Sequence, residues 1–299
     1  MKKNIIRLIL LSSIVLVLAV PVIIFSARSP VLIVTDQSFI PLYGERRIKR
    51  QSMRASFSLF RQVKTVIIAD DAEDDILQYA ITETSARPFC AIFPVRFARG
   101  ARIYREQNPN IPVILLEGRF SETPNRVSSA IGNNPDDYFI YRTDINTDFY
   151  LMGLASVILD REKNERILIY LESQTQTQAR EAISRAFNDT EKQLRTIFYT
   201  SFTQVSSFSD ISCVIISGIR AEYFEKGADL PVICHTWIDP ELLPPEIVIV
   251  FNDSPWVQAV PAVRMAAAGM KTGLIQSSRV ILTGRDMNKE TLSKIRKIL

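Results

Sequence analysis

The sequence predicts an α/β fold with two doubly wound parallel-sheet lobes that follow an N-terminal apolar helix. The first observation is a set of short, continuous apolar runs after residue 30, which are typical of strands buried on both faces of a parallel sheet. The second is that helix-like stretches separate most of these runs, as parallel pairing requires. The third is a polar segment, 119–137, which divides the runs into two series.

The first series alternates strand and helix from residue 31 to about 118. Asn108, Pro109 and Asn110 form an evident helix stop and turn near its end. Right-handed crossovers between such units build one doubly wound lobe. The predicted strands are 31–36, 65–71, 89–94 and 112–118, and the predicted helices are 43–61, 73–86 and 97–107.

The second series begins at residue 138 and continues to the C-terminus. In the helix from 175, apolar residues from Ala179 to Phe187 recur at helical spacing and predict a face that covers a second sheet. The predicted strands are 138–144, 166–173, 196–201, 211–218, 231–237, 246–253 and 279–284. The predicted helices are 147–161, 175–194, 219–226 and 255–270, followed by a basic helical C-terminus.

Residues 1–27 predict a signal peptide or a membrane anchor. Three basic residues within the first seven precede an apolar run from Leu8 to Phe25, close to the roughly 20 residues that span a bilayer. Cleavage after Ser26 or Ala27 and retention as a single-span anchor both stay open. If the segment is retained, residues 5–25 contact the membrane. No cysteine stands near its end, so a bacterial lipoprotein anchor is not expected.

Composition and charge exclude several classes of protein. The chain is 47% hydrophobic and 23% charged, which is ordinary for a globular protein and unlike a disordered or multi-span one. The formal net charge is +4, and the three basic residues of the N-terminal segment account for all but +1 of it. We therefore expect no nucleic-acid partner.

The few residues suited to redox, metal or nucleophilic chemistry have structural explanations. Cys90, Cys213 and Cys234 lie in apolar strands and are interpreted as buried small residues, with Cys213 and Cys234 the pair to consider for a disulfide. His235 is the only histidine, so a common zinc site lacks its second His. No Ser/His/Asp spacing, nucleophile elbow or phosphate loop accompanies it. We expect no enzyme, metal site or cofactor.

Two segments resemble a known family, the type I periplasmic solute-binding proteins. The segment 34–48 is similar to the first strand and loop of its nucleoside-binding basic membrane lipoprotein-like branch, although this chain lacks the lipobox cysteine. The segment 138–189 resembles the middle of the family. There, Tyr141 to Asp144 match a strand that crosses between lobes, and Met152-Gly153-Leu154-Ala155 match a small-residue helix face. Ile167 to Glu172 match the next strand, and Arg180 to Phe187 match an Arg-x-x-x-Phe-like pattern.

The resemblance implies two lobes that are joined by three crossings and close on a ligand like a hinged clamp. The crossings are expected near 117–140, 236–246 and 272–279. Lobe 1 is expected to comprise 31–118 plus 247–272, and lobe 2 to comprise 138–236 plus 278–299.

Polar and aromatic residues at the strand ends are the candidate ligand-binding residues, because ligands of such sheets bind beyond the carboxyl ends of the strands. Carboxylates there accept charge-assisted hydrogen bonds from hydroxyl groups, which favours a sugar or nucleoside, and an aromatic ring would stack on the ligand. The candidates are Asp36, Phe39, Asp70, Arg96, Glu117, Asp144, Glu172, Trp237, Asp239 and Asn252.

Several candidates also have an ordinary structural interpretation. Asp36 and Asp144 suit helix N-caps, and the five acids between Asp70 and Asp75 suit a helix N-terminus. Arg96 suits a salt bridge, and Trp237 suits packing between the lobes. Both interpretations stay open at this point.

The leading hypothesis is an exported solute-binding protein that captures a small polar ligand for an ABC-type permease. Its expected location is the periplasm or the outer face of the cytoplasmic membrane. The alternative is a membrane-anchored sensory or interaction ectodomain with the same clamp. An α/β hydrolase is the least favoured, because the histidine partner and nucleophile motifs are missing.

Overall fold

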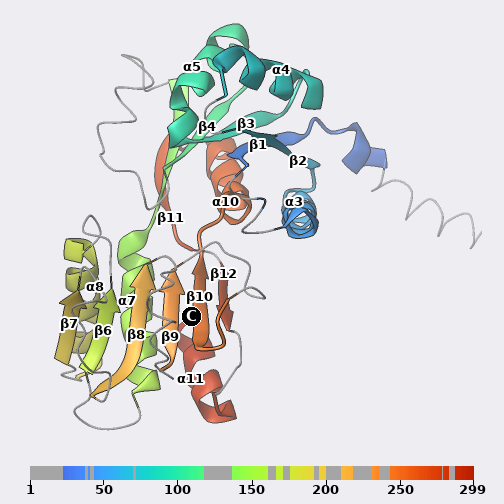
Figure 1. Cartoon of the computed structure of the whole chain (residues 1–299). Helices are drawn as coiled ribbons and strands as arrows, with labels where there is room; N and C mark the ends of the chain where they lie inside the picture. Colours follow the sequence, from blue (N-terminus) through green and yellow to red (C-terminus); the bar gives the residue numbers. More distant parts are fainter. Residues whose placement is uncertain are drawn as a thin grey trace, which may run out of the picture.

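Two α/β lobes, each built on one six-stranded sheet, make up the computed structural model (Figure 1). Most of the apolar segment predicted at 1–27 lies outside the described residues. Among the helices that are described, none has the length and hydropathy needed to cross a membrane. The structure describes residues 23–37, 40, 44–69, 72–117, 137–160, 166–170, 176–191, 195–199, 210–217, 230–235, 243–277, 279–282 and 287–299.

Lobe 1 contains an all-parallel sheet, sheet A, with the strand order β11-β5-β4-β3-β1-β2. Along β1, Val31 and Ile33 pack into one apolar core, and Leu32 and Val34 pack into another on the opposite face. Burial on both faces explains the continuous apolar runs. The strands are β1 (Val31–Asp36), β2 (Val63–Ile68), β3 (Cys90–Pro94), β4 (Val113–Glu117), β5 (Tyr138–Thr143) and β11 (Thr272–Ile275).

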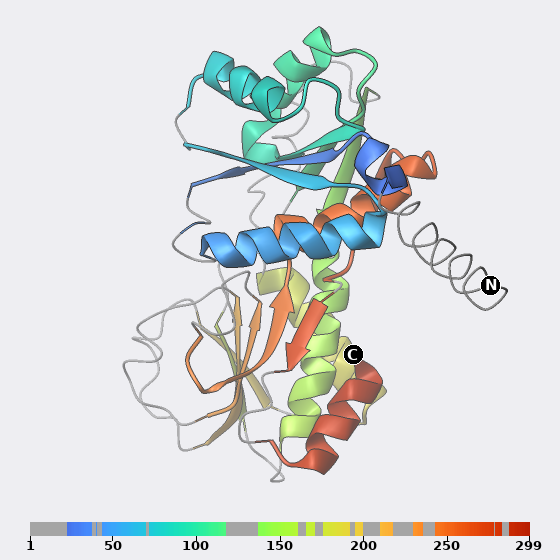
Figure 2. The same ribbon diagram turned by 90° about the vertical axis from the view of Figure 1, so that its right-hand side faces the viewer.

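Helices cover both faces of sheet A. On one face lie α4 (Asp74–Thr84) and α5 (Ala98–Gln107), the latter preceded by the 3-10 turn η1 (Val95–Phe97). On the other face lie α3 (Glu45–Leu59) and α10 (Pro255–Ala267), which pack against each other (Figure 2). Lobe 1 is therefore a three-layer structure, as the sequence predicts.

Lobe 2 contains sheet B, with the strand order β12-β10-β9-β8-β6-β7. All its pairs are parallel except β10 with β12, which is antiparallel. One face is covered by α7 (Ile145–Leu159), α8 (Gln176–Asp189) and α11 (Lys289–Ile298). The strands are β6 (Arg166–Tyr170), β7 (Arg195–Tyr199), β8 (Ile211–Ser217), β9 (Val232–His235), β10 (Ile247–Asn252) and β12 (Arg279–Leu282).

The chain passes between the lobes three times, between β5 and α7, between β10 and α10, and between β11 and β12. Strand placement differs from the prediction, which put 138–143 in lobe 2 and 247–252 in lobe 1. Instead β5 pairs with β4 in sheet A, and β10 pairs with β9 in sheet B. The first two crossings consequently follow these strands instead of lying near 117–140 and 236–246. A uniformly apolar strand carries no local signal of the sheet that it joins.

The third crossing falls inside the predicted range 272–279, but that range also contains a strand. Residues of β11 pair in parallel with β5, from Thr272 opposite Ile140 to Ile275 opposite Thr143. The chain then passes to β12 through residues 276–278. The short, mostly exposed β11 has a single apolar buried residue, Ile275, which explains why no apolar run marks it.

The three cysteines are free and buried, which confirms their interpretation as small buried residues. A disulfide between Cys213 and Cys234 is excluded by strand register. In the pairing of β8 with β9, Cys234 lies opposite Ile216, three residues beyond Cys213. At about 3.3 Å per residue this offset alone is about 10 Å, beyond the reach of a disulfide.

Candidate functional site

The carboxyl ends of the two sheets face each other. β5 ends at Thr143 and leads directly into α7 of lobe 2, while β10 ends at Asn252 and leads into α10 of lobe 1. Because the neighbouring strands are parallel, their ends lie along the same two edges. In Figure 1 the arrowheads of β8, β9 and β10 point toward lobe 1. Residues at these edges are therefore placed between the lobes.

On the edge of sheet A, the structure brings two predicted ligand-binding residues together. Asp36 ends β1 and its side chain is fully buried, and Arg96 lies in η1 just after the neighbouring strand β3. The guanidinium of Arg96 pairs with the carboxylate of Asp36 and lies over the ring of Phe97, 5.2 Å from the ring centroid. Partial burial lowers the pKa of Arg96. The salt-bridge interpretation of Arg96 is confirmed, and its side chain stays 40% exposed.

A second pair of the same kind lies two strands away. Glu117 ends β4, is buried, and pairs with the Nε of Arg142 on the neighbouring strand β5. The side chain of Arg142 is 47% exposed. Each pair thus consists of a buried carboxylate held by a guanidinium whose side chain is partly exposed. The edge of sheet A therefore presents two guanidinium groups, each held in a fixed orientation by a buried carboxylate.

Asp144 and Asn252 have structural roles at two crossings. Asp144 caps α7, because its carboxylate accepts hydrogen bonds from the backbone N of Thr147 at 3.1 Å and from its Oγ1 at 2.7 Å. Asn252 is buried, and its Oδ1 accepts from the backbone N of Ser254 at 2.9 Å. The capping interpretation of Asp144 is confirmed, and ligand contact by either residue stays a prediction.

Two hydroxyl groups near the strand ends have no partner among the described residues. Thr35 is the penultimate residue of β1 and Ser217 is the last residue of β8, and both are almost completely buried. Neither Thr35 Oγ1 nor Ser217 Oγ makes a hydrogen bond within the described part of the chain. Buried polar groups are usually satisfied, so such positions are typical of sites where a water or a ligand supplies the bond.

A buried polar cluster ties the three crossings together. Asp148, in the first turn of α7, accepts hydrogen bonds from the backbone N of Ser277 at 3.1 Å and from its Oγ at 2.7 Å. Nε2 of His235 lies 3.2 Å from Asp148 and 3.3 Å from Ser277 Oγ. Asp253, in the second crossing, is 3.9 Å from the same nitrogen. The cluster thus joins the start of α7, the end of β9 and two crossings.

This cluster combines a serine, a histidine and an aspartate without presenting a nucleophile. Ser277 Oγ donates to the carboxylate of Asp148, and Asp148 and His235 are fully buried. The rings of Phe149 and Phe251 pack edge-on against the imidazole. The structural interpretation of His235 is therefore supported. Sequence inspection missed Asp148, although an acid directly before the apolar helical run 149–155 is a signal of a buried polar contact.

Half of the predicted site cannot be placed. Phe39, Asp70, Glu172, Trp237 and Asp239 lie outside the described residues. The described half consists of Asp36, Arg96, Glu117, Asp144 and Asn252, all of which lie at strand ends or crossings. Among them, Asp36 and Arg96 form a salt bridge with each other.

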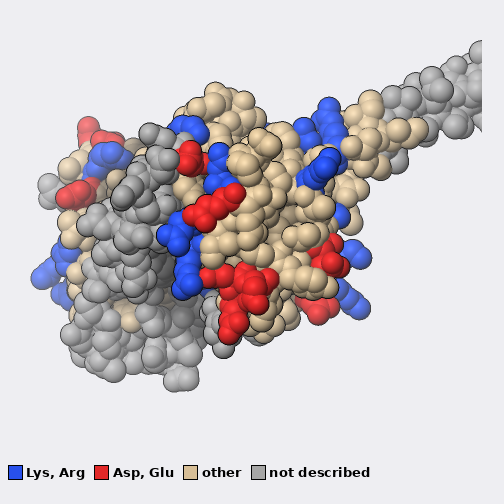
Figure 3. All heavy atoms as spheres, turned by 90° about the horizontal axis from the view of Figure 1, so that it is seen from above, with Lys and Arg blue, Asp and Glu red and all other residues tan. Residues whose placement is uncertain are grey.

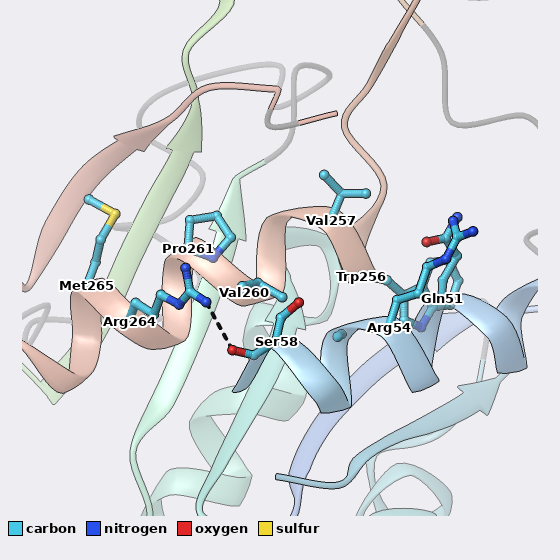
Figure 4. Close-up of a pocket in the computed structure, with 10 residues that line it drawn as sticks. Gln51, Arg54, Ser58, Trp256, Val257, Val260, Pro261, Arg264 and Met265 are labelled. Atoms are coloured by element: carbon cyan, nitrogen blue, oxygen red, sulfur yellow. Dashed lines mark hydrogen bonds between the residues drawn. The ribbon is translucent and has the colours of Figure 1, made fainter. Parts of the chain in front are cut away.

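A pocket with a fully described lining lies elsewhere, between α3 and α10 on the outer layer of lobe 1. It has a volume of about 410 Å³. In Figure 4 Gln51, Arg54 and Trp256 lie at one end, and Arg264 donates a hydrogen bond of 3.0 Å to the carbonyl of Ser58. The indole of Trp256 is buried and donates to Thr65 Oγ1 at 2.9 Å. None of the residues predicted at strand ends lines this pocket.

Comparison with known proteins gives matches only among solved structures. No protein-family model and no curated protein matches the chain. A crystal structure of a periplasmic ribose ABC transporter protein from Conexibacter woesei superimposes with a TM-score of 0.53 at 14% identity, covering 90% of this chain and 95% of that chain. A mutant XylFII–LytSN complex superimposes with a TM-score of 0.55 at 14% identity, covering 86% and 98%.

The chain has the type I periplasmic binding-protein fold. The resemblance seen in segment 138–189 therefore predicted the architecture correctly. In open α/β sheets ligands bind beyond the carboxyl ends of the strands, and Asp36, Arg96, Glu117 and Arg142 stand at these ends in sheet A. At 14% identity the likeness extends to the fold, and function has to be argued from the site.

Proposed function

We propose that the chain is an exported solute-binding protein that captures a small polar ligand, a sugar or nucleoside, between its lobes for an ABC-type permease. The observation that carries this proposal is the pair of opposed sheet edges, one of which holds Asp36–Arg96 and Glu117–Arg142. Three crossings at one side of these edges allow the lobes to open and close about a hinge.

The chemistry of the edges suits a hydroxylated ligand. The guanidinium groups of Arg96 and Arg142 are held by buried carboxylates, and both side chains stay partly exposed, where a ligand oxygen can accept from an N–H. Thr35 Oγ1 and Ser217 Oγ, one from each lobe, add groups that both donate and accept. Hydroxyl groups of a sugar, which also donate and accept, match this mixture.

A binding role, without catalysis, is supported by how the polar groups are used. Asp148, His235 and Ser277 bond to one another in a buried cluster, so none of them is positioned to attack a ligand. The name of one structural neighbour, a periplasmic ribose ABC transporter, also supports a transport role and a location outside the cytoplasm.

A second candidate is a membrane-anchored sensory or interaction ectodomain with the same clamp. The observation that favours it is the packing of Phe25, at the end of the apolar run, on Phe57 and Phe60 of lobe 1. An N-terminus docked on the folded lobe agrees with a retained segment. N-terminal sequencing of the mature protein separates the two candidates, because a cleaved chain starts near residue 27 and an anchored one does not.

The ligand proposal is tested by thermal-shift screening of pentoses, hexoses, nucleosides and amino acids against the full chain. A ligand at 100 times its Kd stabilises the folded state by about 2.7 kcal/mol, which gives a clear rise in Tm. We expect a sugar or a nucleoside to produce this rise. If no compound in the panel raises Tm, or if only amino acids raise it, the proposed ligand class is contradicted.

Two arginine variants test whether the ligand that raises Tm binds near Arg96. Arg96→Lys keeps the charge opposite Asp36 but loses the planar fork of donors, so we expect the ligand-induced rise in Tm to shrink. Arg99→Lys is the matched control, because Arg99 is 77% exposed on α5 and pairs with Asp74. Equal ligand responses in the two variants would show that the ligand binds away from Arg96.

A further inference from the structure

The outward face of α3 has an unusual composition for a helix surface in water. Arg46, Arg50, Met53, Arg54 and Phe57 follow one another at helical spacing, and all five are exposed. Met53 is 51% exposed and Phe57 is 72% exposed. We call these five residues the α3 stripe. It contains three cations, two large apolar side chains and no acid, whereas an ordinary solvated helix face is polar or carries both signs of charge.

The apolar run of the N-terminus ends at this stripe. The ring of Phe25 stacks on Phe57 at 6.3 Å and meets Phe60 edge-on at 5.9 Å. The guanidinium of Arg28 lies 5.1 Å from the centroid of the Phe60 ring, and Arg61 donates to the carbonyl of Ser29 at 3.2 Å. The end of the segment that precedes the lobe is therefore fixed beside α3, with Ile23 and Ile24 exposed.

The charges around this position have the same sign. Figure 3 shows Lys and Arg side chains beside the root of the N-terminal segment. Within the described residues, no salt bridge to an acid engages Arg46, Arg50 or Arg54. Their charge is consequently available to an anionic partner.

We propose that the α3 stripe, together with Phe25, Arg28 and Phe60, docks lobe 1 on the surface of an anionic lipid bilayer. Phe57 and Met53 insert at the boundary between headgroups and acyl chains, and the arginines pair with lipid phosphates. The run from Leu8 to Phe25 leads to this face, so a bilayer that holds the retained run would be the surface that the face meets. This docking rests on the second proposed function, in which the N-terminal segment is retained, and it is independent of which ligand the interlobe edges bind.

A second copy of the chain fits the stripe less well. Two copies related by symmetry would place the same three arginines against each other, and like charges at an interface are unfavourable. An anionic bilayer attracts the same arginines and also solvates the exposed Phe57 and Met53.

The test uses the full chain reconstituted in phosphatidylcholine vesicles, with and without phosphatidylglycerol, and with lipids brominated on their acyl chains as quenchers. Phe57→Trp places a fluorophore in the stripe. Tyr79→Trp is the matched control, because Tyr79 is a 68% exposed aromatic residue on α4, on the opposite face of sheet A. Emission of the parent chain, which contains Trp237 and Trp256, is subtracted from both.

We expect Phe57→Trp emission to be quenched several-fold more than Tyr79→Trp emission, and more strongly when phosphatidylglycerol is present. Adding Arg50→Glu and Arg54→Glu to the Phe57→Trp chain should reduce the quenching to the level of Tyr79→Trp. The control for this change is Arg296→Glu with Lys297→Glu, which reverses two exposed charges on α11 of lobe 2 and should leave the quenching unchanged.

Equal quenching of Phe57→Trp and Tyr79→Trp would overturn the proposal. The proposal would also be overturned if Phe57→Trp emission shifted with protein concentration in the absence of lipid. That result would show that the α3 stripe binds a second copy of the chain. Circular dichroism of each variant checks that the exposed substitutions leave the fold intact. The ligand screen is a separate measurement, so failure of docking is distinguishable from failure of the proposed clamp.

Discussion

Asp148 holds two other buried polar residues, Ser277 and His235, in place. Its carboxylate accepts two hydrogen bonds from Ser277 and lies 3.2 Å from Nε2 of His235, and Asp148 itself is fully buried. Without it, the N–H of Ser277 loses its hydrogen bond in a position that water does not reach. Asp148 thus stabilises the third crossing by holding it against α7.

We predict that Asp148→Ala lowers the free energy of unfolding by about 3 to 5 kcal/mol, because it leaves buried partners uncompensated. Ser277→Ala should cost less, about 1 to 2 kcal/mol, since it removes one hydroxyl and leaves the backbone N–H bonded. Urea unfolding followed by circular dichroism measures both values.

Asp189→Asn is the control for this prediction, because Asp189 bonds to the hydroxyl of Tyr150 on the surface and should have no measurable effect on unfolding. If Asp148→Ala unfolds at the urea concentration of the parent chain, the cluster contributes nothing to stability and our account of the hinge is wrong.

At the scale of elements, the packing of α7 on α8 shows how a local pattern becomes a tertiary contact. A Cβ atom added at Gly153 would lie 2.8 Å from Ala186 Cβ and 3.3 Å from Ile183 Cα. The helices therefore approach each other where both carry small residues. The small-residue segment Met152 to Ala155 and the alanine spacing of 175–194 were both visible in the sequence, but their mutual contact was not.

We predict that Gly153→Ala destabilises the chain by about 1 to 3 kcal/mol through overpacking, offset by at most about 1 kcal/mol of gained helix propensity. The double variant Gly153→Ala with Ala186→Gly should recover part of the loss, because it removes the colliding methyl group. Thermal unfolding of the two single variants and the double variant gives the coupling energy.

Gly100→Ala on α5 is the matched control, because the added Cβ would meet Leu77 Cδ2, the movable end of a flexible side chain. We expect Gly100→Ala to cost less than Gly153→Ala. Additive effects of Gly153→Ala and Ala186→Gly would contradict a direct contact between the two positions.

At the scale of the whole molecule, burial of ionisable groups makes stability depend on alkaline pH. Burial raises the pKa of the Cys90 thiol to about 12, and it raises the pKa values of Tyr104 and Tyr141 to about 12 as well. The hydroxyl of Tyr141 also donates to the carbonyl of Met270 at 2.6 Å, which requires its proton. All three groups are neutral in the folded chain near pH 10.

In the unfolded chain the thiol of Cys90 ionises near its ordinary value of 9.0. Between pH 9 and 12 the unfolded state therefore binds fewer protons than the folded state, so the free energy of unfolding falls as pH rises. Cys90 contributes a slope of about 1.4 kcal/mol per pH unit in this window and none below it.

We predict that Cys90→Ala makes the loss of stability between pH 9 and 12 less steep than in the parent chain. Urea unfolding at several pH values across the window measures the slope, and comparing slopes removes any constant effect of the substitution. An identical slope in the two chains would show that Cys90 ionises in the folded state.

The periodicity of apolar residues was sufficient to predict most strands and helices of both lobes, because burial on both faces of a sheet leaves a local record in the sequence. It was also sufficient to select the strand-end residues Asp36, Arg96 and Glu117, since the ends of apolar runs are local features. It missed β11, which is short and largely exposed, and whose pairing with β5 comes from the fold.

The sequence by itself determined the elements, their order, the two-lobed α/β class and the residues that stand at the strand ends. Only the tertiary structure decided which sheet β5 and β10 join, which guanidinium holds which carboxylate, and that Asp148 meets Ser277, 129 residues away. The physical reason is that hydrophobic periodicity is recorded within a few residues of the chain, whereas sheet membership and buried polar contacts depend on segments that meet only after folding.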